Sequence, residues 1–246
     1  IYTYEIDFYD ELVHDETNIW FDFPYDVQIR REFPEWNENK TWTLGWGASP
    51  NLNINNLISN KIAKCYWKVL SRSATTIINA HQVGIKVNNS DYVATATFDR
   101  YKHKVVEGEF NSNLLKNGSN SFTLNVLNGT GIFHDWFELE YPRKLVLQDT
   151  IIFSFRNNAI YNQNYKIKIL KNTSNNFVLI KNNPQNNETY FIDNYTLIQD
   201  TIIFNDTIKE KINYFCYDVN KIKNPKFLYR KQFNNFITDK NQADYI

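Results

Sequence analysis

The sequence has 246 residues with 27 basic and 27 acidic side chains, and its pI is near 7.1. A neutral chain lacks the basic field that draws proteins to nucleic acids or to anionic membranes, so neither is expected as a partner. Hydrophobic residues make up 42% of the chain, which is typical of a folded protein with one large or two smaller cores, and no apolar run is long enough to predict a membrane span.

The first 24 residues are acidic and aromatic, and we expect a leading strand or a connection from an upstream region. Methionine is absent, so we expect the natural start to have been removed or to lie upstream. Three tryptophans follow across polar residues, at Trp36, Trp42 and Trp46. Such rings could stack on sugars, but we favour the simpler interpretation that they plug a sandwich end or contact a neighbouring domain.

Alternation of apolar and polar residues dominates the next part of the chain. It predicts half-buried strands at 64–70, 81–87, 121–126 and 135–141. The expected inward faces carry Cys65, Trp67 and Val69; His81, Val83, Ile85 and Val87; Phe122, Leu124 and Val126; and Phe137, Leu139 and Tyr141. Turn sequences separate these runs, including Asn117-Gly118 and the segment 87–91, which is expected to form a hairpin. The spacing predicts a jelly-roll-like antiparallel β-sandwich over 25–147.

After Pro142-Arg143 the strands become shorter and the loops richer in asparagine. We expect a smaller, Ig-like β domain over 148–222, so the predicted fold class is all-β throughout. Residues 223–246 are interpreted as a linker that leads into Ala243-Asp-Tyr-Ile246. This ending has the pattern of a buried first strand, which predicts a further domain that is truncated here.

The inventory of chemically active residues is thin. His81 falls on an inward strand face, where a hydrogen-bonded core histidine is expected, and His134 is expected to cap the start of a strand. Cys65 and Cys216 lie in apolar strands, which favours buried free thiols, with a long-range disulfide as the alternative. Glu138 and Glu140 are expected to point outward from their strand.

No catalytic residue, organic cofactor or metal ligand set is predicted from these patterns. A structural calcium ion is the one alternative kept open, with carboxylate ligands drawn from Asp91, Asp99 and Asp135.

Several segments resemble motifs of a known family in their order along the chain. They are His81-Gln-Val-Gly-Ile-Lys-Val-Asn88, Leu114-Leu-Lys-Asn-Gly-Ser-Asn120, Asp135-Trp-Phe-Glu-Leu-Glu-Tyr-Pro-Arg143, the run from Cys216 to Pro225, and Gln242-Ala-Asp-Tyr-Ile246. Together they resemble the region before the caspase-like domain of gingipain-type cysteine peptidases, a family that includes the sortase-like peptidase of type IX secretion. The first 60 residues match weakly, and Asn89 stands where the family pattern has glycine.

The resemblance implies a secreted or surface-exposed bacterial protein whose partner is a downstream peptidase domain of the same polypeptide. The catalytic His and Cys of the family belong to that domain, so no catalytic residue is carried over. We therefore expect a non-catalytic scaffold for a gingipain-like peptidase. Two alternatives stay open: a carbohydrate-binding or adhesive surface module, and a structural subunit of a surface assembly that pairs through exposed strand edges with other surface or secretion-system proteins.

Overall fold

The computed structural model describes most of the chain, in ten stretches. These are residues 4–16, 20–21, 42–43, 49–71, 76–99, 102–148, 150–155, 159–171, 176–209 and 211–222. The described residues form strands and two short 3₁₀ helices, η1 (Ser112–Leu114) and η2 (Val219–Lys221), with no α-helix among them. The predicted all-β class is confirmed.

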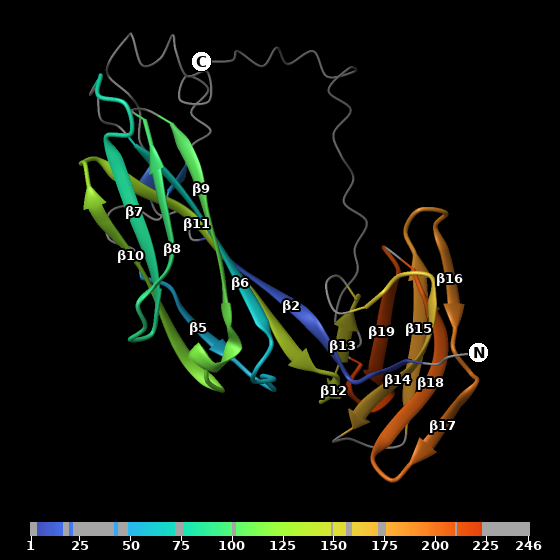
Figure 1. Cartoon of the computed structure of the whole chain (residues 1–246). Coiled ribbons are helices and arrows are strands. Elements are labelled where there is room, and N and C mark those ends of the chain that lie inside the picture. Colours follow the sequence, from blue (N-terminus) through green and yellow to red (C-terminus); the bar gives the residue numbers. More distant parts are fainter. Residues whose placement is uncertain are drawn as a thin grey trace, which may run out of the picture.

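Eight strands form the first sandwich, on the left of Figure 1. They are β2 (Phe8–Asp15), β5 (Asn51–Ile54), β6 (Ile62–Ser71), β7 (His81–Val87), β8 (Tyr92–Phe98), β9 (His103–Asn111), β10 (Gly118–Asn128) and β11 (Ile132–Lys144). One sheet has the order β2-β11-β6-β9 and the other β5-β10-β7-β8. Counted along the chain, these are strands 1-8-3-6 and 2-7-4-5, the double Greek key of a jelly roll.

The core of this sandwich follows the period-two pattern of the sequence. Trp67 and Phe137 are fully buried, and their rings lie 4.9 Å apart in an edge-on arrangement. Phe122 packs on Phe137 with ring centroids 4.6 Å apart. The expected inward faces of β6, β7 and β11 are confirmed, whereas Val126 was expected inward and is 46% exposed. It lies beside an irregularity in the β10–β7 pairing, where the alternation breaks down.

Two asparagines, from the motifs at 81–88 and 114–120 that resemble the gingipain-type family, stabilise one end of the first sandwich by hydrogen bonds. Asn88 has a positive φ of 50° and closes the predicted β7–β8 hairpin. Its side chain donates to the Asn120 side chain at 3.0 Å and accepts from the Ser121 N–H at 3.0 Å. Asn120 is fully buried, and its carboxamide bonds the backbone of Lys116 in both directions. These motif residues therefore have a structural role, because they satisfy backbone groups at a buried turn.

The remaining strands form a second, smaller sandwich, on the right of Figure 1. They are β1 (Tyr4–Ile6), β12 (Val146–Leu147), β13 (Thr150–Phe153), β14 (Gln163–Lys171), β15 (Phe177–Asn183), β16 (Glu188–Phe191), β17 (Tyr195–Ile198), β18 (Thr201–Ile208) and β19 (Asn213–Asp218). One sheet has the order β1-β14-β18-β17, with β12 also on β14, and the other β13-β19-β15-β16. β14-β18-β17 and β19-β15-β16 occupy the places of Ig strands B-E-D and F-C-C′, with β13 in the place of strand G.

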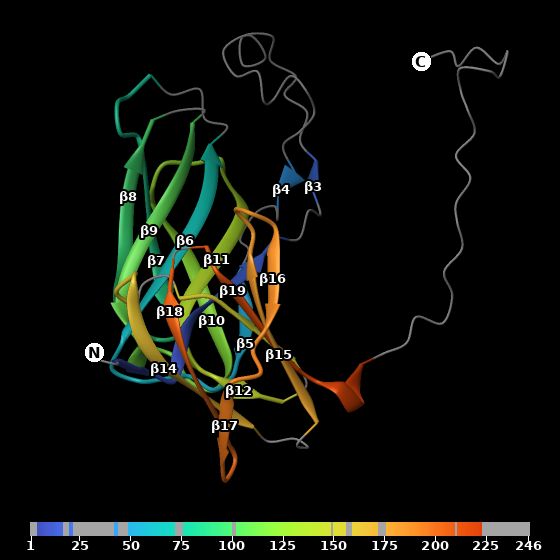
Figure 2. The same cartoon turned by 90° about the vertical axis from the view of Figure 1, so that its right-hand side faces the viewer.

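A pair of neighbouring strands joins the two sandwiches. β1 continues into β2, and β11 continues into β12, with β2 and β11 paired up to Phe8 opposite Lys144. Both continuations then lie parallel to β14, β1 against residues 165–167 and β12 against residues 170–171. The two sandwiches are thus connected twice, through one hydrogen-bonded ribbon. They lie side by side in Figure 1, and in Figure 2 the second sandwich lies in front of the first.

The strands cross the predicted division of the chain at several points. The leading segment expected over 1–24 contains β1, which lies in the second sandwich, and β2, which lies in the first. β12 precedes residue 148 and packs in the second core through Leu147. The boundaries 25–147 and 148–222 stay a prediction about independently folding units, and residues 223–246 lie outside the described residues. The pair β3 (Trp20–Phe21) and β4 (Trp42–Thr43) completes the described strands.

Candidate functional site

The outer face of the β2-β11-β6-β9 sheet carries four of the ion pairs in the described part of the chain. A β-bulge in β11 sets Asp135 and Trp136 together opposite Lys68 of β6. Lys68 Nζ lies 2.7 Å from Asp135 Oδ2, and the carboxylate side chain is only 8% exposed. A bulge re-aims side chains in this way, and bulges are common next to binding sites.

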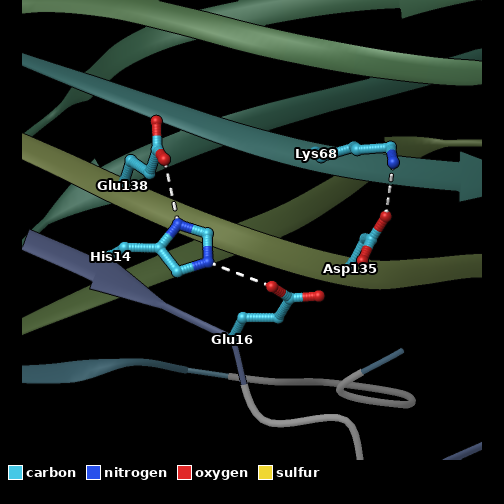
Figure 3. A network of polar contacts seen from close by, with 5 residues as sticks. All are labelled: His14, Glu16, Lys68, Asp135 and Glu138. Carbon is cyan, nitrogen blue, oxygen red and sulfur yellow. Dashed lines mark hydrogen bonds and ion pairs between the residues drawn. The ribbon is translucent and has the colours of Figure 1, made fainter. Parts of the chain in front are cut away.

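His14 of β2 lies between two carboxylates on the same face, as Figure 3 shows. Its Nδ1 is 2.9 Å from Glu138 Oε1 and its Nε2 is 3.1 Å from Glu16 Oε2. The hydrogen bond to Glu16 and that to Glu138 raise the pKa of His14 above its ordinary value, against a smaller opposing effect of burial. The Trp136 ring lies 6.0 Å from the His14 ring, so an aromatic surface adjoins this titratable group.

A groove of about 480 Å³ opens at the other end of the same face. Its lining residues are Phe8, Asp10, Lys61, Ile62, Lys64, Glu109 and Glu140. Lys64 is paired with Glu109 at 2.9 Å, and the Lys61 ammonium lies 5.0 Å from the centre of the Phe8 ring. The groove therefore offers apolar surface together with several carboxylates, which suits a polar ligand with an apolar side.

A second polar cluster lies at the ribbon between the two sandwiches. Arg143 donates to the Glu11 carboxylate at 2.5 Å, and the Tyr9 hydroxyl donates to the same carboxylate. Burial, together with this hydrogen bond, raises the pKa of Tyr9, so its hydroxyl stays protonated. Tyr9 also packs on Phe153 of the second core, with ring centroids 5.9 Å apart. The cluster links β2, β11 and the second sandwich, which fits a role in holding their relative orientation.

The groups that could support nucleophilic chemistry are buried. Ser71 Oγ and His81 Nε2 are 2.9 Å apart, but both residues are fully buried, as expected for a core histidine. Desolvation lowers the pKa of His134 to about 4, so this imidazole is neutral near pH 7.

The two cysteines are free and fully buried, each in a different core, which excludes the alternative disulfide. Burial raises the pKa of both thiols to about 12, and the thiolate that acts as a nucleophile is therefore scarce.

The predicted ligand residues are not brought together. Trp36 and Trp46 lie outside the described residues, and Trp42 is described only as part of the short strand β4. Asp135 is paired with Lys68, while Asp99 accepts from the Asn79 N–H at 2.7 Å. In the described part of the chain, no three His, Cys, Asp or Glu side chains form a metal-binding group. The tryptophan platform and the calcium ion therefore stay predictions.

Sequence reasoning missed His14 and the groove, because both depend on partners far apart in the chain. His14 and Glu138 are separated by 124 positions. The outward direction of Glu138 and Glu140 was expected from alternation and is confirmed by their register with β2 and β6. Their neighbours on β2 could not be known without the sheet order.

Comparisons with known proteins were informative only at the level of structure. No family model matches the sequence, and no curated protein is similar to it. The fold is similar to the crystal structure of dimeric latent PorU from Porphyromonas gingivalis, with a TM-score of 0.65 over 89% of this chain. Sequence identity is 12%, so the likeness is one of fold alone, and the chain spans 21% of the length of that protein. Among the described residues, no helix is long and apolar enough to cross a membrane.

Proposed function

We propose that this chain is the non-catalytic β-sandwich portion of a secreted, gingipain-like cysteine peptidase, and that it positions a downstream peptidase domain of the same polypeptide. Two lines of support are independent of each other. The order of the sequence motifs resembles the region before the caspase-like domain of that family. The fold resembles latent PorU, a gingipain-related protein.

The observation that carries the scaffolding role is the double connection between the sandwiches. A single flexible linker would leave them free to reorient, whereas a hydrogen-bonded ribbon with the Glu11–Arg143 ion pair resists bending. A rigid pair of sandwiches is what a positioning element requires. The proposed location is extracellular or at the bacterial outer-membrane surface, and the proposed further partners are other surface or secretion-system proteins.

The test has two parts. The gene should encode, beyond residue 246, a caspase-like sequence with a His and a Cys that each follow an apolar strand. Mass spectrometry of the native protein should find these residues in the polypeptide or in its cleaved partner. A gene that stops at residue 246 with no caspase-like sequence after it would refute the proposal. Small-angle scattering then asks whether the two sandwiches keep one fixed separation in solution.

Glycan binding is a second candidate, and the groove on the outer sheet face favours it. Phe8 offers a ring for stacking, while Asp10 and Glu140 offer acceptors for sugar hydroxyls. Binding on a glycan array that is lost in Phe8→Ala would support this function through the groove. Loss in Trp42→Ala or Trp46→Ala would support it through the predicted tryptophan platform. No binding to any polysaccharide would count against both.

A further inference from the structure

An apolar row crosses all four strands of the β13-β19-β15-β16 sheet, in the sandwich at the right of Figure 1. Ile152 of β13 lies opposite Phe215 of β19. Ile180 of β15 lies opposite Phe215 on one side and Phe191 of β16 on the other. Buried residues alternate with Ile152 and Phe215 along their strands, so the row faces outward from the core. At its two ends Ile152 is 57% exposed and Phe191 is 67% exposed.

The rows on either side of the apolar row carry no charge. Val178 and Tyr217 lie opposite each other in one flanking row. In the other, Asn182 lies opposite Thr189 and donates to its Oγ1 at 2.9 Å, so two polar members of the face bond each other. We call these three rows, with the row from Ile152 to Phe191 at their centre, the neutral face. Apolar surface gathered in this way on a soluble protein is typical of a contact site.

The other three four- or five-stranded sheets carry charged side chains on their outer faces. The β2-β11-β6-β9 sheet presents Lys68, paired with Asp135 at 2.7 Å. The sheet that contains β1 and β14 presents Glu5, paired with Lys166 at 3.2 Å. On the β5-β10-β7-β8 sheet, the Lys86 ammonium lies 4.7 Å from the centre of the Tyr92 ring. Covering any of these faces would desolvate charges, whereas covering the neutral face would not.

We infer that the neutral face binds the same face of a second copy of this chain. A two-fold axis brings identical patches together, so each copy offers the other a surface without charge and no buried ion is left unpaired. The centres of homodimer interfaces are apolar and depleted of charged residues, as this face is. Sheets that pack face to face interdigitate their side chains, and Ile152 and Phe191 would lose most of their exposed surface.

The size of the neutral face predicts a weak dimer. Four strands span about 19 Å and three alternate rows span about 20 Å, so each copy contributes roughly 400 Å² in projection. Two copies together bury about 800 Å², less than the roughly 1,200–2,000 Å² of stable complexes. A dissociation constant of about 10–500 μM is therefore expected. This contact goes beyond the proposed function, since it needs only residues of this chain and holds whether or not a peptidase domain follows.

Sedimentation equilibrium of the full chain at about 5–500 μM tests the inference directly, because the average mass should rise from one copy toward two. Phe191→Lys and Ile152→Lys should each weaken the association at least about tenfold, since each buries a cation in an apolar contact. The control Ile62→Lys, at a residue 64% exposed on the first sandwich, should leave the association unchanged. Equal melting temperatures of the three variants exclude unfolding as the cause.

Oxidative footprinting of the same samples locates the contact. Labelling of Phe191 and Tyr217 should fall as the protein concentration rises, whereas labelling of Tyr92, 41% exposed on the first sandwich, should stay constant. A chain that remains monomeric at the highest concentration overturns the inference. Association that survives both Phe191→Lys and Ile152→Lys also overturns it, since another surface would then join the copies, as does constant labelling of Phe191. None of these outcomes touches the proposed positioning role, which the gene sequence tests.

Discussion

The two sandwiches reach a closed core in different ways. The first is built from β2 and the continuous run β5–β11, and its inward aromatic residues Trp67, Phe122 and Phe137 are fully buried. The second takes β1 from the start of the chain to cover one edge of β14 and leaves Leu197 half-exposed at the other side. A sandwich that takes a strand from outside its own run at one edge depends on its connections.

The largest expected effect comes from the closed core. Trp67→Ala removes a fully buried ring that contacts Phe137, and should lower the free energy of unfolding of the first sandwich by about 3–5 kcal/mol. Because β1 and β12, the strands that pair with β14, continue β2 and β11 of the first sandwich, we expect the second sandwich to lose hydrogen-exchange protection as well. Full protection of β14 and β18 in this variant would contradict the coupling. Ile62→Ala, in the same strand but 64% exposed, should change stability by less than about 0.5 kcal/mol.

The strand at the start of the chain gives the next effect. Ile6 of β1 is 4% exposed and packs in the second core, so Ile6→Ala should cost about 2–4 kcal/mol there. All six tryptophans lie at or before Trp136, so tryptophan fluorescence reports the unfolding of the earlier part of the chain, while exchange in β14 reports the second sandwich. Tyr4→Ala, 41% exposed in the same strand, is the matched control. Equal losses of exchange protection in β14 in both variants would argue against burial of Ile6 as the cause.

The polar cluster of the ribbon should have an intermediate effect. Arg143→Ala leaves the half-buried Glu11 carboxylate without its cation, and should destabilise the chain by about 1–3 kcal/mol. Scattering should also detect a wider range of separations between the sandwiches. Lys102→Ala, which breaks the exposed pair with Asp99 at 3.3 Å, should cost less than about 1 kcal/mol. A double-mutant cycle of Glu11→Gln with Arg143→Ala isolates the pair.

The smallest effect is pH-dependent and belongs to His14. Its pKa is raised in the folded state, so the stabilisation is fully present below the unfolded pKa of about 6.5 and is lost as pH rises through the folded value. Since His14 is partly exposed, the contribution should stay below about 1 kcal/mol. The free energies of unfolding in urea of the native chain and of the His14→Gln variant should differ at pH 6 and converge at pH 8.5. A difference that grows with pH would reverse the assigned sign. Subtracting the unfolding free energy of the variant from that of the native chain removes the contribution of His134, which is the same in both proteins.

The alternation of apolar and polar residues predicted the strands that bury one face and expose the other. It missed strands whose two faces are equally exposed. His81, Val83, Ile85 and Val87 were placed on one side of their strand, and all four are fully buried. β17 was not predicted, because all four of its residues are exposed and no buried alternation marks it.

Long-range partners were beyond the reach of the sequence pattern. β1 is a three-residue strand whose partner lies 161 positions later, from Tyr4 to Tyr165. The bulge at Asp135 and Trp136, which orients the candidate face, leaves no mark in a period-two pattern. Local sequence therefore predicted the scaffold, while the candidate site depends on which strands become neighbours.

The pairing of β1 with β14 has a consequence for how the chain folds during synthesis. β1 emerges before the first sandwich, yet its partner β14 follows only after all strands of that sandwich have been synthesised. Closing a loop of that length is entropically costly and slow. When β2 pairs with β11, however, residue 8 is brought opposite residue 144, and the remaining distance along the chain to β14 becomes short. Folding of the first sandwich thus acts as a template that delivers β1 to its partner, so a ribosome pause before residue 163 would leave the first strand waiting beside an unfinished sheet.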